Sequence, residues 1–115
     1  MDTAQALDVL HALAQETRLD VVRLLVVHGH EGLKAGDIAD QLGVAHNTLS
    51  AHLSILLAAR LVNRVREGRA LWYRIRFDTL SALMAFMLTD CCQGVPEIID
   101  VMPAIVARCQ PGDCT

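Results

Sequence analysis

Aromatic residues are scarce in this 115-residue chain: there is one Trp, one Tyr and two Phe, although 53% of the residues are hydrophobic. We therefore expect a core of Leu, Val, Ile and Ala. Long hydrophobic runs are also missing, because none approaches the ~18 residues that a membrane-spanning helix needs. Residues 1–5 lack the basic segment and the following apolar block of a signal peptide. These absences predict one cytoplasmic domain over residues 1–115, with no membrane partner.

Net positive charge is missing too, since the formal charge is −3. This total by itself argues against binding to nucleic acid. The distribution of charge argues for it, because six of the ten Lys and Arg residues lie between positions 60 and 76, with Glu67 as the one acid among them. A local basic patch matters more for DNA binding than the total does.

A helix-turn-helix is predicted over about 34–60. Residues 34–42 have the pattern of a short helix, and Gly43 suits the left-handed residue that follows a helix. In the next helix, Leu49, Leu53, Leu56 and Leu57 form one apolar stripe. An ordinary helical hairpin would show the same pattern, so this stretch alone does not separate that alternative from a DNA-binding motif.

The other side of this helix carries short side chains in place of the Lys and Glu of a solvated surface. Such a face suits a helix that lies against DNA and donates short hydrogen bonds. We expect His46, Asn47 and Ser50 to reach base edges. The candidate DNA-binding residues of the helix are His46, Asn47, Thr48, Ser50, Ala51 and Ser54.

A basic β-hairpin is predicted next. Residues 63–66 and 71–76 alternate with period two around the turn 67–70, where Gly68 can take a positive φ. The alternation predicts a core face of Val65, Leu71, Tyr73 and Ile75, and an outer face of Arg64, Arg66, Arg74 and Arg76. A basic hairpin beside a helix-turn-helix makes a winged helix. We expect Thr48, Arg64, Arg66 and Arg69 to contact phosphates or a groove.

Four further helices complete a mainly α fold with one small β-hairpin, in the order α-α-α-α-β-β-α-α. Two precede the motif, over 3–15 with Asp2 or Thr3 as N-cap, and from Thr17, as N-cap, to Gly29. Another begins at 77–79 with Asp78 as N-cap, and a short one covers about 96–108. The first helix and the one after the hairpin have broad apolar stripes that a small core cannot cover. We therefore expect them to pair in a homodimer through Leu7, Leu10, Leu80, Leu83, Met84 and Met87.

All four cysteines lie in the last 25 residues, at positions 91, 92, 109 and 114. In the cytoplasm we expect reduced thiols, which serve metal binding or redox chemistry more often than structural disulfides. Thiolates are the preferred ligands of soft metal and metalloid ions.

Several segments together resemble the ArsR family of metalloregulatory repressors. They are residues 12–19, residues 42–53, Leu61-Val62, and Gly68-Arg69 with Tyr73. The resemblance covers nearly the whole chain. It implies a homodimeric winged helix that binds a palindromic operator in double-stranded DNA and releases it when a metal or metalloid binds.

The resemblance also implies a sensing segment over about 89–115. Arsenic sensors of the family have Cys-Cys-Gln-Gly, then Pro-Glu, and a third Cys seven residues after the first. Here Cys91-Cys92-Gln93-Gly94 and Pro96-Glu97 match, but Ile98 replaces the third Cys. We therefore expect Cys109 or Cys114, from this chain or its partner, to supply the third sulfur. The predicted metal ligands are Cys91, Cys92, Cys109 and Cys114, with As(III) or Sb(III) as inducer and no organic cofactor.

Two other sensing modes stay open on the same fold: a thiol-redox-responsive repressor, in which the cysteines form a disulfide, and a Zn/Cd-responsive one. From a different class, the chain could be a thiol enzyme or a metalloid carrier. It has no Cys-x-x-Cys and no phosphate-binding loop, and neither activity would explain an arginine-rich hairpin. We therefore expect a DNA-binding protein that is not an enzyme.

Overall fold

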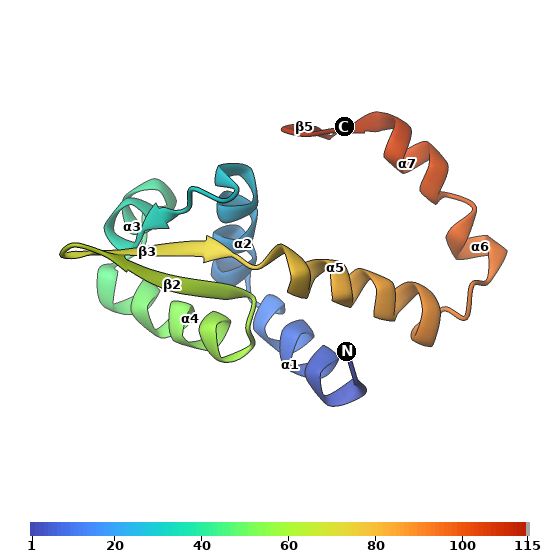
Figure 1. The fold of residues 1–115 in the computed structure, drawn as a ribbon, viewed down its shortest axis with the longest axis horizontal. Coiled ribbons are helices and arrows are strands. Elements are labelled where there is room, and N and C mark those ends of the chain that lie inside the picture. The colour runs from blue at the N-terminus through green and yellow to red at the C-terminus, as the bar shows by residue number, and fades with distance from the viewer. Residues whose placement is uncertain (115) are drawn as a thin grey trace.

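Helices pack on one face of a small antiparallel sheet, and a C-terminal arm extends away from them (Figure 1). This arrangement comes from a computed structural model that describes residues 1–114. The helices are α1 (Thr3–Leu13), α2 (Glu16–His28), α3 (Ala35–Leu42), α4 (His46–Ala58), α5 (Phe77–Phe86), the π-helix η1 (Met87–Cys91), α6 (Pro96–Ile99) and α7 (Met102–Arg108). The strands are β1 (Leu33–Lys34), β2 (Val62–Glu67), β3 (Ala70–Ile75), β4 (Cys109–Gln110) and β5 (Asp113–Cys114). The predicted winged helix is confirmed.

The core is aliphatic, as the scarcity of aromatic residues requires. Its side chains come from α1, α2, α3, α4, α5 and the sheet, and Tyr73 is its one aromatic residue. The leucine stripe of α4 is buried there through Leu49, Leu53 and Leu56. In α1 the buried residues are the smaller Ala6, Val9 and Ala12, so this helix approaches the core closely, with Leu7 and Leu10 turned outward.

The sheet has the strand order β1-β3-β2, with β3 in the middle. Strand β1 has two residues, which pair with Tyr73 and Trp72. No pattern in the sequence predicts this strand. Gly32 makes this pairing geometrically feasible. It has a φ of +77°, and a Cβ at this position would collide with the Tyr73 carbonyl oxygen. Only glycine combines a positive φ with such a close backbone approach.

The register of the hairpin corrects the predicted faces. Val65 lies opposite Trp72, and Arg64 lies opposite Tyr73. Opposed residues of an antiparallel pair point to the same face of the sheet. Val65 therefore does not share the core face with Tyr73 and Ile75, whereas Arg64 and Arg66 do share that face. The two arginines continue the helix-covered side of the sheet beyond the end of the core, where they are exposed.

Two predicted N-caps are also wrong. Helix α2 begins at Glu16, and its N-cap is Gln15, whose side chain accepts a hydrogen bond from the Arg18 backbone N–H. Thr17 therefore lies inside the helix. Helix α5 has Arg76 as N-cap, so Asp78 lies in its first turn and bonds Arg76 instead. The Asp2 cap of α1 is confirmed as a capping box with Gln5.

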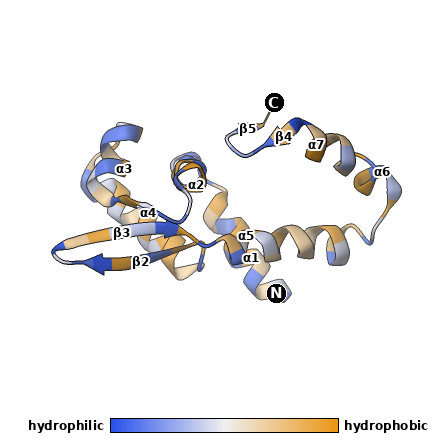
Figure 2. Cartoon of the chain, turned by 45° about the horizontal axis from the view of Figure 1, so that its top comes forward, coloured by the Kyte–Doolittle hydropathy of each residue, from blue (hydrophilic) through white to orange (hydrophobic). Residues whose placement is uncertain are grey.

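The C-terminal arm, defined here as residues 95–114, contains two short helices where one was predicted. Helix α6 ends at Ile99, and Pro103 lies in the first turn of α7. A proline disfavours helical geometry in the residue before it and tolerates only the first turn of a helix, which explains the break. No residue of the arm is buried. Hydrophobic residues occur along it and along α5 (Figure 2). Within residues 1–114, no helix is long and apolar enough to cross a membrane.

Candidate DNA interface and cysteine sites

The outer face of α4 is open over its first two turns. His46, Asn47, Thr48, Ser50, Ala51 and Ser54 are all exposed, as the sequence predicted. Gly43, at a φ of +66°, ends α3 in the left-handed conformation and starts the turn into α4. The N-cap residue Ala45 makes no side-chain hydrogen bond to α4, but Asn47 Oδ1 accepts from the Thr48 backbone N–H at 3.0 Å. Among the described residues, the backbone N–H groups of His46 and Asn47 have no side-chain partner and can meet an anion. Ser54 is less available, because its hydroxyl donates to the Ser50 carbonyl oxygen at 3.1 Å.

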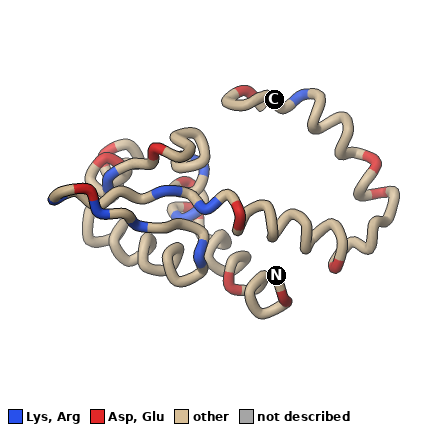
Figure 3. The backbone as a smooth tube through the Cα atoms, in the orientation of Figure 1, with Lys and Arg blue, Asp and Glu red and all other residues tan. Residues whose placement is uncertain are grey.

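The arginines of the hairpin fall into two groups. Arg74 donates to Glu67 at 3.1 Å, and Arg76 donates to Asp78 at 2.9 Å. The Arg76 hydrogen bond lowers the pKa of the Asp78 carboxyl, which keeps this pair charged over a wider pH range. Arg64, Arg66 and Arg69 take part in none of the ion pairs found within residues 1–114, and all three are exposed. Figure 3 shows the basic residues spaced along the two strands of this hairpin.

Helix α4 and the hairpin present these groups at one end of the molecule. Strand β2 follows α4 directly and runs back along it, so the tip of the hairpin lies near the N-terminus of α4 (Figure 1). The exposed polar face of α4 and the unpaired arginines therefore form a single edge. One edge can thus combine base-reading side chains with phosphate-binding charges.

Arg18 supports this edge from inside, and no pattern in the sequence indicated this role. Only 8% of the residue is exposed. Its Nε donates to the Ala12 carbonyl oxygen at 2.6 Å, and its Nη1 lies 3.4 Å from Nδ1 of His52 on α4. Arg18 thus joins the end of α1 to α4. In the sequence Arg18 lies among polar and charged residues and looks like a solvated arginine.

A second surface covers neighbouring parts of α1 and α5. Leu7 is 59% exposed, Leu10 is 39% exposed and Met84 is 61% exposed, while Leu80 and Met87 are half-buried. Leu7, Leu10 and Met84 are therefore open to a partner, whereas Leu80 and Met87 pack partly against the core of their own chain. Pairing through this surface stays a prediction. The prediction that Leu83 lies in the dimer interface is wrong, because Leu83 is only 4% exposed and belongs to the core of its own chain. It points inward because it packs where α5 contacts the rest of the domain.

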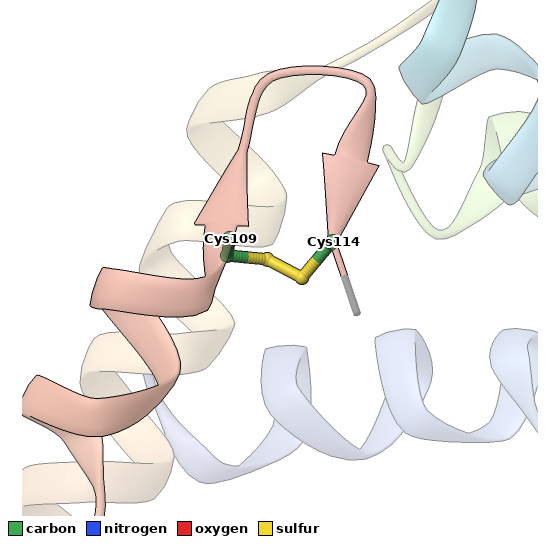
Figure 4. Close-up of a disulfide and its surroundings, with 2 residues drawn as sticks. All are labelled: Cys109 and Cys114. Carbon is green, nitrogen blue, oxygen red and sulfur yellow. A yellow bond between two sulfur atoms is a disulfide. The ribbon is translucent and has the colours of Figure 1, made fainter.

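The four cysteines form two separate pairs. Cys91 is exposed and Cys92 is half-buried, and both are free thiols at the end of η1. Cys109 and Cys114 are joined by a disulfide across β4 and β5 (Figure 4). The expectation of four reduced thiols is therefore wrong for this second pair. Residues 1–114 contain no group of three or more His, Cys, Asp or Glu side chains placed to hold a metal ion. The arm carries the second pair away from the first (Figure 1).

Comparison with known proteins agrees with this geometry. A family model described as a helix-turn-helix domain matches residues 13–65. The transcriptional repressor SdpR of Bacillus subtilis is 30% identical over 87 residues, which cover 76% of this chain and 93% of the relative. An ArsR-like transcriptional regulator from Rhodococcus sp. RHA1 superposes with a TM-score of 0.71 at 25% identity, covering 88% of this chain and 92% of that one.

The chain belongs to the ArsR family.

Two further structures of similar proteins bear on assembly and function. The homodimeric winged helix-turn-helix domain of Mb0332 from Mycobacterium bovis, a possible ArsR-family regulator, has a TM-score of 0.62 at 29% identity, covering 84% of this chain and 86% of that chain. A "possible transcriptional regulator for arsenical resistance" has a TM-score of 0.61 at 29% identity, covering 90% and 97%. This ArsR-family chain is a DNA-binding transcriptional regulator and not an enzyme.

Proposed function

We propose that this regulator works in the cytoplasm as a homodimeric repressor, which binds a palindromic operator and releases it when As(III) or Sb(III) binds its C-terminal cysteines. The observation that carries the inducer is the free, adjacent pair Cys91 and Cys92 at the end of the α5–η1 helix. That helix also carries the exposed Met84 of the dimer surface. The similarity to a possible regulator for arsenical resistance gives further support.

DNA binding follows from the edge formed by α4 and the wing. His46, Asn47 and Ser50 would contact base edges, while Thr48, Arg64, Arg66 and Arg69 would contact phosphates or a groove. A two-fold dimer through α1 and α5 would present two such edges. The two α4 helices must then lie about 34 Å apart to enter successive major grooves.

The backbone at Cys91 and Cys92 already departs from α-helical geometry, which supports a ligand-binding role. Residues 87–91 form a π-helical turn, and the Cys92 N–H donates to the Met87 carbonyl oxygen at 2.9 Å. Gln93 follows with a φ of +55°. On a regular α-helix adjacent side chains diverge by about 100°, so two neighbouring thiols do not share an ion easily. A widened helix end gives them freedom to converge, and π-turns are frequent at functional sites.

Coupling to DNA would act through the dimer helices. A metalloid held by Cys91 and Cys92 needs a third sulfur, which Cys109 or Cys114 of either chain could supply once their disulfide is reduced. Pulling the arm towards the end of η1 would tilt α5 and change the spacing of the two α4 helices. A coupling free energy of about 1.4 kcal/mol already weakens DNA binding tenfold.

Fluorescence anisotropy on the protein's own promoter fragment tests this proposal. With reductant present throughout, near-stoichiometric arsenite or antimonite should release the DNA from the natural chain, and Cys91→Ser should abolish the release. Tight DNA binding without release by either ion would reject the metalloid inducer. Failure to bind a palindromic promoter would reject the repressor itself.

A second candidate inducer is an oxidant, because the structure contains a disulfide between Cys109 and Cys114. In this alternative, peroxide releases the DNA and reductant restores binding. The same anisotropy assay separates the two inducers, since metalloid release persists in excess reductant and redox release does not. Zinc and cadmium are the remaining alternatives and enter the assay as additional titrants.

A further inference from the structure

The terminal hairpin places two sulfurs opposite each other. Cys109 pairs with Cys114, and Gln110 pairs with Asp113, so the connection is the dipeptide Pro111-Gly112. Gly112 has a φ of +81°, as required at the third position of a type II turn, and proline is favoured at the second. The local sequence therefore favours this turn whether or not the sulfurs are bonded. Reduction of the disulfide leaves two thiols on neighbouring strands, facing the same side.

This pair is accessible and separate from Cys91 and Cys92. Cys114 is exposed and Cys109 is half-buried, on an arm that has no buried residue in its described part. No third His, Cys, Asp or Glu joins the pair within residues 1–114. The reduced hairpin is thus a two-sulfur site, and its ligand must need only two sulfurs.

We propose that the reduced hairpin binds a trivalent arsenical that carries one organic substituent, independently of the Cys91–Cys92 pair. Such a compound has two exchangeable hydroxyl groups on arsenic. Each thiol of Cys109 and Cys114 forms one As–S bond, and each displaced hydroxyl leaves with the thiol proton as water. Arsenic remains trivalent, so the step needs no oxidant or reductant. Inorganic arsenite has three exchangeable hydroxyl groups, so one of them stays unreplaced at this site. Arsenite therefore binds more weakly than the organic arsenical.

Pre-organisation explains why this pair should bind tightly. A ligand that closes a ring through two thiols binds better when the thiols are already placed together, because less conformational entropy is lost. The disulfide is the closed form of the same site. A small-molecule thiol opens it by exchange: two such thiols become one disulfide, and Cys109 and Cys114 take up the two protons.

The test uses the full chain with Cys91→Ser and Cys92→Ser, which leaves only the hairpin thiols. The protein is reduced, freed of reductant without air, and titrated with phenylarsine oxide. Native mass spectrometry should show one phenylarsenic per chain, with loss of both titratable thiols. The oxidised protein should show none. Absence of an adduct on protein with two counted thiols would overturn the proposal.

Two variants of that protein make the test specific. Adding Cys114→Ser should remove the stable adduct, and an equally stable adduct would contradict a two-sulfur site. Adding Gly112→Val keeps both thiols but places a β-branched residue at a positive φ, which should weaken binding about tenfold. Unchanged affinity would show that the turn does not pre-organise the pair. DNA release is not read in this experiment, so its outcome does not depend on the function proposed for Cys91 and Cys92.

Discussion

Arg69 differs from its basic neighbour Arg74 in having no acidic partner among the described residues. We expect Arg69→Ala to weaken binding to every DNA sequence, because a phosphate contact carries no sequence information. The slope of log affinity against log salt should become shallower by about 0.9 for each phosphate that the variant no longer neutralises. Anisotropy at several salt concentrations measures both quantities. Arg108→Ala on the arm is the matched control for charge; a changed sequence preference for Arg69→Ala would contradict a pure phosphate role.

Arg18 should contribute more to the stability of the fold than a surface arginine does. Replacing it with Met keeps much of the apolar side chain but leaves the Ala12 carbonyl without its charged donor. We expect the free energy of unfolding to fall by about 2–3 kcal/mol, measured by urea denaturation. Arg23→Met, on the same helix, removes only an exposed pair with Asp20 and should cost less than about 0.5 kcal/mol. Equal losses would contradict the structural role of Arg18.

Among the elements, β1 depends on a single backbone position. Gly32→Ala should be destabilising both through its positive φ and through the collision with Tyr73. Gly43→Ala is the control, because Gly43 has a left-handed φ of +66° with open space around it. We expect about 1 kcal/mol of destabilisation for the control and a further ~2 kcal/mol for Gly32→Ala. Thermal unfolding of both variants decides whether the close approach matters.

Elements with strong periodic patterns were predictable, and those decided by one residue were not. The leucine stripe of α4 follows from local chemistry and is confirmed, and of the two predicted caps for α1, Asp2 and Thr3, the structure has Asp2. The face of Val65 depends on strand register, and a shift of one residue reverses every side chain. Strand β1 is too short for any alternation to appear. The exposed polar residues of α4 were predictable, but the pairing of Arg74 with Glu67 depends on the same register.

At the scale of the whole molecule, the exposed leucines of α1 and the Met84 side chain should hold two copies together. We expect Leu7→Glu to produce monomers in sedimentation velocity, because a charge would be buried in the interface. Operator affinity should fall on the order of a hundredfold, since each half-site then binds alone. Val27→Glu, at a 75% exposed position of α2, is the control and should change neither property. A dimeric Leu7→Glu protein would place the interface elsewhere.

The path of the C-terminal arm decides which cysteines lie together, and the sequence did not reveal this pairing. Their number and spacing indicated one shared site, but the break at Pro103 and the hairpin at Pro111-Gly112 divide them into two pairs. Each is a local turn decided by one or two residues, and no hydrophobic periodicity encodes it.

The Arg18 bridge between α1 and α4 has a mechanical consequence. Helix α1 contributes to the predicted dimer surface and α4 to the DNA edge, so we expect each protomer to move as a rigid body. A change at the dimer surface would then alter the distance between the two α4 helices without altering the fold of either protomer. Inducer-bound protein should accordingly retain affinity for single half-sites and should prefer operators whose half-sites are spaced differently.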